Sequence, residues 1–163
     1  MKIPRMKFRS MSSLVVLCAL LSMVACKKDS DDPAPQNGVE GTWQLTALTF
    51  NPAFNGITDY VSALQATGNT CASQINFVFN NNGSITINSP NTCTDTKDLF
   101  MQSLGINSST TWKVEGDKLV LTTGTDVTQI NLSVNQSTMT LTDTGAIPPA
   151  TTVYTVTFSF KRV

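Results

Sequence analysis

Apolar residues occupy every second position on both sides of a short turn in the middle of the chain. They share one parity before the turn and one after it: Ile75, Phe77, Phe79, Ile85 and Ile87. A period of two is typical of a strand with one buried and one solvated face. The turn at 80–83 ends in Asn-Gly, which tolerates the positive φ of a tight hairpin. The pattern therefore predicts a β-hairpin.

A cysteine lies just outside each strand of this hairpin. If Phe79 faces Ser84 across the turn, the pairing continues back until Cys71 lies near Thr92 and Cys93. The two cysteines then form a disulfide, or they remain as free, buried thiols. We expect the disulfide, because the N-terminal residues discussed below indicate export from the cytoplasm.

The segment before the hairpin begins with another alternating stretch. Residues 39–50 read as a strand whose apolar parity slips after Ala47, which predicts a β-bulge or a barrel bend. Residues 51–56 are expected to form a loop.

Two short helices are expected beside the hairpin. The first covers 58–66, with Thr58 as its N-cap. The second covers 95–104, with Asp95 as its N-cap and Gly105 ending it.

The rest of the chain is nearly all strand. Five further segments alternate: 110–114, 118–122, 126–134, 137–142 and 152–160. An antiparallel meander of eight strands is most easily completed by closing on itself, which removes its edges. We therefore expect an all-β fold, an eight-stranded antiparallel up-and-down barrel with one or two short helical insertions. The alternative is a two-sheet β-sandwich, which the same alternation permits.

A barrel of this size is either just filled by side chains or holds one small ligand. The residues that we expect to line such a cavity, or to fill it as core, are Trp43, Leu45, Ile75, Phe77, Phe79, Trp112, Leu121, Leu132, Tyr154 and Phe158. Alternation does not distinguish the two cases, so both stay open.

The N-terminus has the layout of an export signal. Residues 1–10 are basic, and 11–25 form an apolar run that is too short for a comfortable membrane span. The run ends in Met-Val-Ala before Cys26, which resembles a bacterial lipobox and predicts lipidation of Cys26. The alternative is an ordinary secretory signal with a chance cysteine. We expect a signal peptide at 1–25, a lipidated cysteine with a disordered acidic tether at 26–38, and the barrel at 39–163.

Charge and composition exclude several functions. Once the four basic residues of the signal are removed, seven basic and eleven acidic residues remain, which argues against a nucleic-acid partner. The chain has no histidine, so the commonest general base and zinc ligand are both missing.

The stretch 141–146 resembles the active-site turn of aspartic proteases, but too little chain follows it, and we interpret Asp143 as a turn residue at a strand end. We expect no enzyme, no cofactor and no metal site.

Several motifs, in their order along the chain, resemble the lipocalin-like lipoproteins of the Bacteroidota. Gly41-Thr42-Trp43 resembles the Gly-x-Trp that opens lipocalin barrels, and the cysteine pair around the hairpin resembles that of the family. The segment 112–119, with a tryptophan before a Gly-Asp turn, and the ending 158–163 are similar as well. The resemblance implies a small barrel, and it implies that Arg162 packs over Trp43.

The acidic residues after Cys26 resemble the signal that sends such lipoproteins to the outer face of the outer membrane. The resemblance thus implies a membrane-anchored protein that faces the cell surface, with the periplasm as the alternative.

Two functions follow from these expectations. The first is a carrier that binds a small apolar ligand inside the barrel. The second is a surface module with a filled barrel, whose segments 51–70 and 89–109 contact a glycan or an outer-membrane protein; the sequence does not identify that partner.

The lipid anchor is testable in cells. Cys26→Ala removes the acceptor thiol, so the variant is expected to remain unprocessed or to become soluble. Fractionation followed by mass spectrometry of the N-terminus checks this, and retention of the variant in the membrane as a processed protein would refute the anchor.

Overall fold

The computed structural model describes residues 38–147 and 151–163. The expected signal peptide, the lipidation at Cys26 and the tether up to residue 37 lie outside these ranges. Within the ranges, no helix has the length and hydropathy needed to cross a bilayer.

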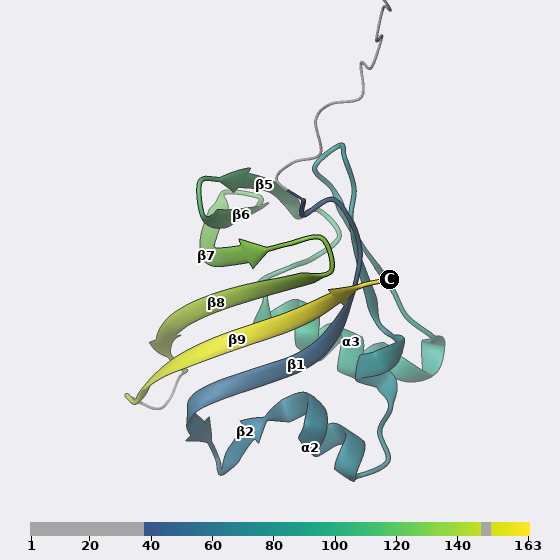
Figure 1. Cartoon of the computed structure of the whole chain (residues 1–163), viewed down its shortest axis with the longest axis vertical. Helices are drawn as coiled ribbons and strands as arrows, with labels where there is room; N and C mark the ends of the chain where they lie inside the picture. Colours follow the sequence, from purple (N-terminus) through teal and green to yellow (C-terminus); the bar gives the residue numbers. More distant parts are fainter. Residues whose placement is uncertain (1–37, 148–150) are drawn as a thin grey trace, which may run out of the picture. The chain divides into compact units, whose positions relative to one another are not determined.

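The fold is built on one antiparallel sheet (Figure 1). Around the sheet its strands run in the order β4-β3-β1-β9-β8-β7-β6-β5, and the short β2 pairs with β1 outside this path. The strands are β1 (Gly41–Phe54), β2 (Ile57–Asp59), β3 (Asn76–Phe79), β4 (Ile85–Asn88), β5 (Thr111–Glu115), β6 (Lys118–Thr123), β7 (Asp126–Val134), β8 (Thr138–Ala146) and β9 (Val153–Arg162).

The two ends of this sheet, β4 and β5, meet through a few contacts. Ser84 and Thr111 form a single bridge between them. The backbone N–H of Trp112 donates to the carbonyl oxygen of Gly83 at 2.7 Å, and its indole Nε1 donates to the carbonyl of Ser84 at 3.1 Å. The result is a nearly closed, eight-stranded, up-and-down barrel with two short helices. The expected fold class is confirmed: the strands form one nearly closed sheet and not the two packed sheets of a sandwich.

Strand β1 carries the bulge that the sequence predicted. Its pairing with β9 shifts between Leu45 and Ala47, where Thr46 is the extra residue and donates its hydroxyl to the carbonyl of Ser159 at 2.9 Å. The strand then continues to Phe54, so the expected loop at 51–56 is wrong. Pairing with β9 and β2 supplies the hydrogen bonds that keep this stretch extended, and such partners are not visible in a local pattern.

The central hairpin forms, but its register differs by one residue from the expectation. Phe79 lies opposite Ile85 and not opposite Ser84, which pairs instead with Asn80 at the turn. Residues directly opposite each other share a face of the sheet, so Phe79 opposite Ser84 would have placed a serine on the buried face.

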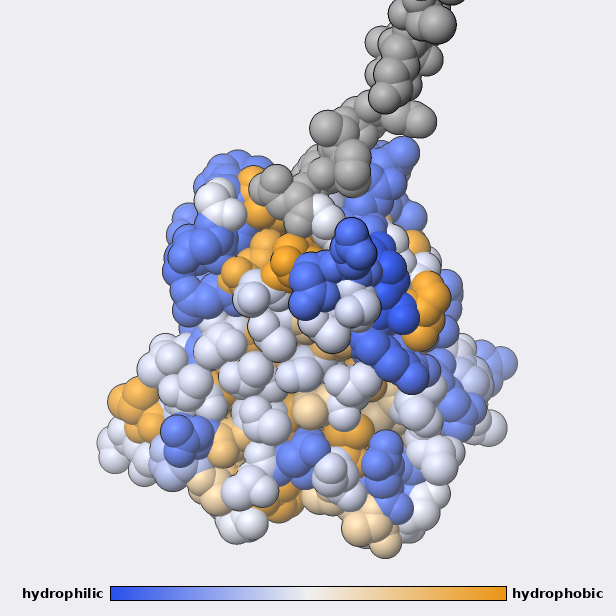
Figure 2. Space-filling view, in the orientation of Figure 1, coloured by the Kyte–Doolittle hydropathy of each residue, from blue (hydrophilic) through white to orange (hydrophobic). Residues whose placement is uncertain are grey.

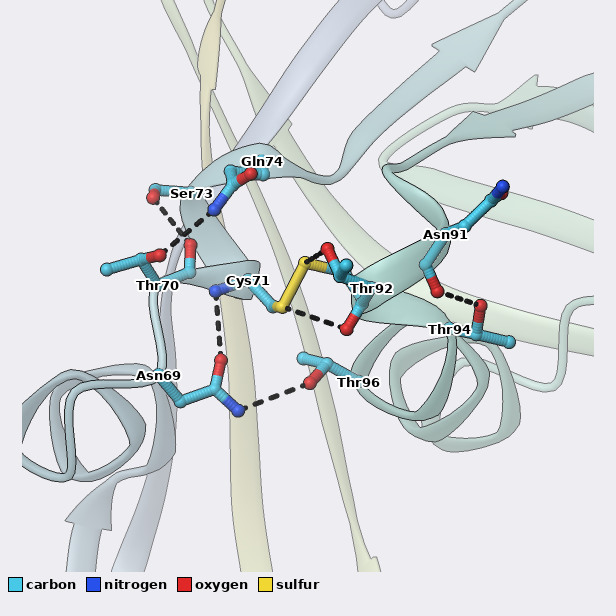
Figure 3. Close-up of a disulfide and its surroundings, with 10 residues drawn as sticks. Asn69, Thr70, Cys71, Ser73, Gln74, Asn91, Thr92, Thr94 and Thr96 are labelled. Atoms are coloured by element: carbon cyan, nitrogen blue, oxygen red, sulfur yellow. Dashed lines mark hydrogen bonds between the residues drawn. A yellow bond between two sulfur atoms is a disulfide. The ribbon is translucent and has the colours of Figure 1, made fainter.

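The disulfide between Cys71 and Cys93 is confirmed (Figure 3), with a Cα–Cα distance of 5.3 Å. The two cysteines lie in single 3₁₀ turns, η1 (Cys71–Gln74) and η2 (Asn91–Cys93), and not on extensions of the strands. Next to the bond, the side chain of Asn69 accepts the N–H of Cys71 at 2.9 Å and reaches Thr96 at 3.5 Å. The covalent link and this bridge tie together the two chain segments that flank the hairpin.

Helix α2 begins one residue later, and helix α3 two residues earlier, than their expected N-caps would place them. Helix α2 (Tyr60–Ala66) is capped by Asp59, whose carboxylate accepts the N–H groups of Val61 and Leu48, while Thr58 lies in β2. Helix α3 (Thr94–Ser103) follows directly from η2, so its N-cap is Cys93 and no side chain caps it. In both cases a tertiary contact sets the helix start: the bond to β1 for α2, and the disulfide for α3.

The barrel interior is filled with side chains. One cluster of buried residues extends from Val39 to Phe160 and includes Val61 from α2 and Phe100 from α3. The outer face of β8, β9 and β1, seen in Figure 2, is mostly pale because threonine and serine occupy its outward positions, as at Thr142 opposite Thr157. The barrel forms its own compact unit up to residue 163, so it has the core that a domain needs to fold alone.

Removing the disulfide is expected to lower the free energy of unfolding of the barrel without unfolding it. The bond closes a loop with a sequence separation of 22 residues. In the chain-entropy model, Cys71→Ala with Cys93→Ala therefore lowers the free energy of unfolding by about 3 kcal/mol. Urea unfolding of residues 38–163 measures the difference, and the unmutated protein with a reductant is the control that changes no side chain. A loss below about 1 kcal/mol in both samples would contradict this role.

Candidate functional site

The two ends of the barrel differ in how they are closed. Near the start of β1 and the end of β9, which we call the sealed end, Trp43 is fully buried and its indole N–H donates to the carbonyl of Val39 at 2.7 Å. The guanidinium carbon of Arg162 lies 4.2 Å from the centre of the Trp43 ring, in the geometry that the lipocalin resemblance implied.

Arg162 also binds the backbone around this end. Its guanidinium donates to the carbonyl of Gln136 at 2.8 Å, to that of Glu40 at 2.7 Å and to that of Gly38. A side chain at Gly41 would overlap this guanidinium, and the φ of +128° at Gly41 disfavours other residues as well. The Gly-x-Trp motif therefore has a structural reason: Arg162 packs closely against both Gly41 and Trp43.

The ten residues expected to line a cavity or fill the core are placed mostly in the filled interior. Nine of them are buried: Trp43, Leu45, Ile75, Phe77, Phe79, Trp112, Leu121, Tyr154 and Phe158. Leu132 is half-buried and packs against them. Aromatic rings fill space against each other, as in the edge-on pairs Phe77–Phe160 and Phe79–Trp112, both 5.4 Å apart. Of the ten, only Phe158 also lines a pocket at the opposite end.

That pocket lies at the end of the barrel where β8 stops and β9 begins, which we call the mouth (lower left in Figure 1). It has a volume of about 270 Å³. Strands β1, β8 and β9, the residue after β8 and the last residue of α3 contribute its lining, which consists of Leu48, Phe50, Ser103, Asp143, Gly145, Ala146, Ile147, Val156 and Phe158.

Strand register explains why these side chains meet. Leu48 lies opposite Phe158 and Phe50 opposite Val156, while Val156 in turn lies opposite Asp143 of β8. Paired residues share a face, so all of them project to the inner side of the sheet. The bulge in β1 makes this possible, because it moves Leu48 onto the face that Leu45 and Trp43 occupy further along.

Gly145 keeps the mouth open. It lies two residues after Asp143, on the same inward face, opposite Tyr154. A Cβ at this position would meet no atom within 4 Å, and its φ is not in the left-handed region. The backbone therefore does not require glycine here, and the missing side chain leaves free space in the pocket.

An aromatic row borders the pocket. The ring of Phe50 lies 5.5 Å from that of Phe54, and Phe54 lies 5.5 Å from Tyr154 in an edge-on contact. These contacts hold the extended end of β1 against β9, which is the stretch that the sequence suggested as a loop.

Two polar side chains face the pocket. Asp143 is exposed, accepts the backbone N–H of Thr144 at 2.8 Å, and forms no ion pair within the described ranges. The hydroxyl of Ser103 donates to the carbonyl of Leu99 at 2.8 Å. The interpretation of Asp143 as a turn residue is wrong, because β8 continues past the expected end at 142 to Ala146.

Sequence reasoning missed most of this pocket. It stopped the strand at 142 and therefore did not extend its parity to Asp143 and Gly145. A signal was present, since Leu141, Asp143 and Gly145 share one parity. The alternation is hard to recognise there, because the inward positions 143 and 145 hold aspartate and glycine and not apolar residues. These positions need not be apolar, since the pocket is open to solvent.

A family model described as a lipocalin-like domain matches residues 39–144. The chain therefore belongs to the lipocalin-like family. No curated protein matches the chain, and no solved structure matches it.

The sealed end is expected to depend on the shape of Arg162 as well as its charge. Arg162→Lys keeps the charge but loses the planar contact with Trp43 and at least one backbone hydrogen bond. The free energy of unfolding is expected to fall by about 1–3 kcal/mol. Urea unfolding followed by tryptophan fluorescence measures it. Lys161→Arg, at the exposed neighbouring position, is the control, and equal stability of the two variants would contradict the prediction.

Proposed function

We propose that this protein binds a small apolar molecule in the pocket at the mouth of its barrel. The observation that carries the proposal is the group of apolar side chains that lines this pocket, Leu48, Phe50, Val156 and Phe158, above an otherwise filled core. A concave, mostly apolar site with a few polar groups is the usual form of a small-molecule site. Membership in the lipocalin-like family is consistent with this role.

The pocket limits the size of the ligand. With roughly 30 Å³ for each non-hydrogen atom, as for a water molecule in the liquid, a volume of 270 Å³ holds a molecule of only about nine such atoms. The ligand is therefore small, or it inserts only one end. Of the two possibilities that the sequence left open for Trp43 and Trp112, lining a ligand cavity or filling the barrel, the second is observed, because both residues pack into the core.

We further propose that the barrel is held at the outer membrane by a lipid on Cys26, facing the cell surface. Support comes from the sequence alone: the basic and apolar residues 1–25, the small residue before Cys26 and the acidic segment after it. Binding without catalysis is proposed because the pocket offers one carboxylate and the chain has no histidine to serve as its partner.

The alternative role, a surface module acting through 51–70 and 89–109, has less support. The large hydrophobic side chains that are exposed within the described ranges are Leu99, Val127, Val153 and Val163. Only Leu99 lies in these two segments, and none of the four is aromatic. The apolar pocket is the more specific feature.

Filling the pocket is expected to abolish binding without unfolding the barrel. Gly145→Trp places an indole in space that is now empty, at a position where the backbone accepts any residue. The probe is octan-1-ol, which is neutral and fits the volume. It is titrated into ¹⁵N-labelled residues 38–163 while the amide signals of 145–147 and 103 are followed. The unmutated barrel is expected to show saturable shifts, and the variant at least tenfold weaker binding.

The matched control is Thr144→Trp, which places the same indole one residue away on the exposed outer face of β8. It is expected to bind like the unmutated barrel. Equal binding by both variants, or no shift at 145–147 in the unmutated barrel, would show that the pocket is not the site.

A further inference from the structure

We propose that the ligand of the mouth pocket carries a protonated amine, so that the protein selects small cationic amphiphiles over neutral or anionic ones. This inference rests on the proposed function and specifies the chemical class of the ligand. It follows from which hydrogen-bonding and charged groups the pocket presents.

Both polar side chains in the lining can only accept hydrogen bonds from a ligand. The hydroxyl of Ser103 has one proton, and it is already donated to the carbonyl of Leu99 at 2.8 Å. Its lone pairs remain available. The carboxylate of Asp143 has no proton to donate and uses one lone pair on the N–H of Thr144. A ligand whose polar group is an acceptor without a proton would find no side-chain donor here.

The charge of Asp143 is not balanced by a neighbouring cation. The basic residues within the described ranges lie elsewhere: Lys97, Lys113 and Lys118 are each within 4.0 Å of an acid outside the pocket, and Arg162 binds the sealed end. Lys161 lies beside Arg162 at the same end of β9. None of the five lines the pocket. The mouth is thus an apolar cup with a net negative charge at its edge.

A primary ammonium group complements this arrangement. It supplies three N–H donors for Asp143 and Ser103 while its alkyl chain contacts Leu48, Val156 and Phe158. A carboxylate head would instead meet a like charge and no side-chain donor. Because Asp143 is exposed, the effect is modest: we expect an amine to bind about fivefold more tightly than the alcohol, and the acid about fivefold more weakly.

The test compares three ligands that share one alkyl chain: octylamine, octan-1-ol and octanoate. Each is titrated at pH 7 and low salt into ¹⁵N-labelled residues 38–163, and a dissociation constant is taken from the shifts at 145–147. The expected order is amine tighter than alcohol, and alcohol tighter than acid. Added salt is expected to compress the differences, because the charges are exposed to solvent.

Asp143→Asn removes the charge and keeps an oxygen for the N–H of Thr144. The three constants are then expected to converge. Asp126→Asn, an exposed acid of β7 outside the pocket, is the matched control and is expected to keep the original order.

The outcomes separate this inference from the proposed function. If octan-1-ol binds at 145–147 but the three ligands bind alike, the preference for amines is wrong. If their order persists in Asp143→Asn, the preference does not come from Asp143 and the inference is overturned as well. In both cases the proposed binding pocket is unaffected. If the same change appears in Asp126→Asn, the effect belongs to net charge and not to the pocket, which also overturns the inference. If octan-1-ol does not bind at all, both proposals fail.

Discussion

The pairing of β1 with β9 is the contact on which the rest of this structure depends. It joins the first strand of the barrel to the last, from Trp43 opposite Arg162 to Asn51 opposite Thr155. Without it the meander would be an open sheet with two exposed edges, which is a liability for a small β-protein. The pairing is also the most distant in sequence, so the chain must order almost all its strands before the barrel can close.

The same pair of strands creates the difference between the two ends of the barrel. At one end Arg162 covers Trp43 and bonds to three carbonyl groups, so polar and aromatic atoms seal the interior. At the other end the bulge rotates Leu48 and Phe50 inward, and β8 contributes Asp143 and Gly145 where bulky apolar residues would have completed the core. One strand pair therefore has a sealed, hydrogen-bonded end and an open end that holds the proposed binding pocket.

The barrel is filled with side chains and has only a small pocket at its mouth, which limits the proposed ligand to that pocket. The large aromatic residues contribute to folding, because they are buried and pack against each other in the core. In the proposed site, specificity would depend instead on a few residues with little core burial, Asp143 and Ser103 among them. Such positions can change between proteins without loss of the fold, because they add little to the free energy of folding.

The sequence alone determined eight of the strands apart from their ends, the bulge in β1, the cysteine pair and most of the buried core residues, because these depend on local parity and on residue chemistry. Only the tertiary structure decided the hairpin register, the helix starts at Asp59 and Cys93, the extension of β1 to Phe54 and of β8 to Ala146, and thus the pocket. Each of these depends on a contact with another segment of the chain: the face shared across a strand pair, the bond from Asp59 to Leu48, the disulfide, or the neighbouring strand β9. A local pattern shows which residues can be buried, but not which distant residues they meet.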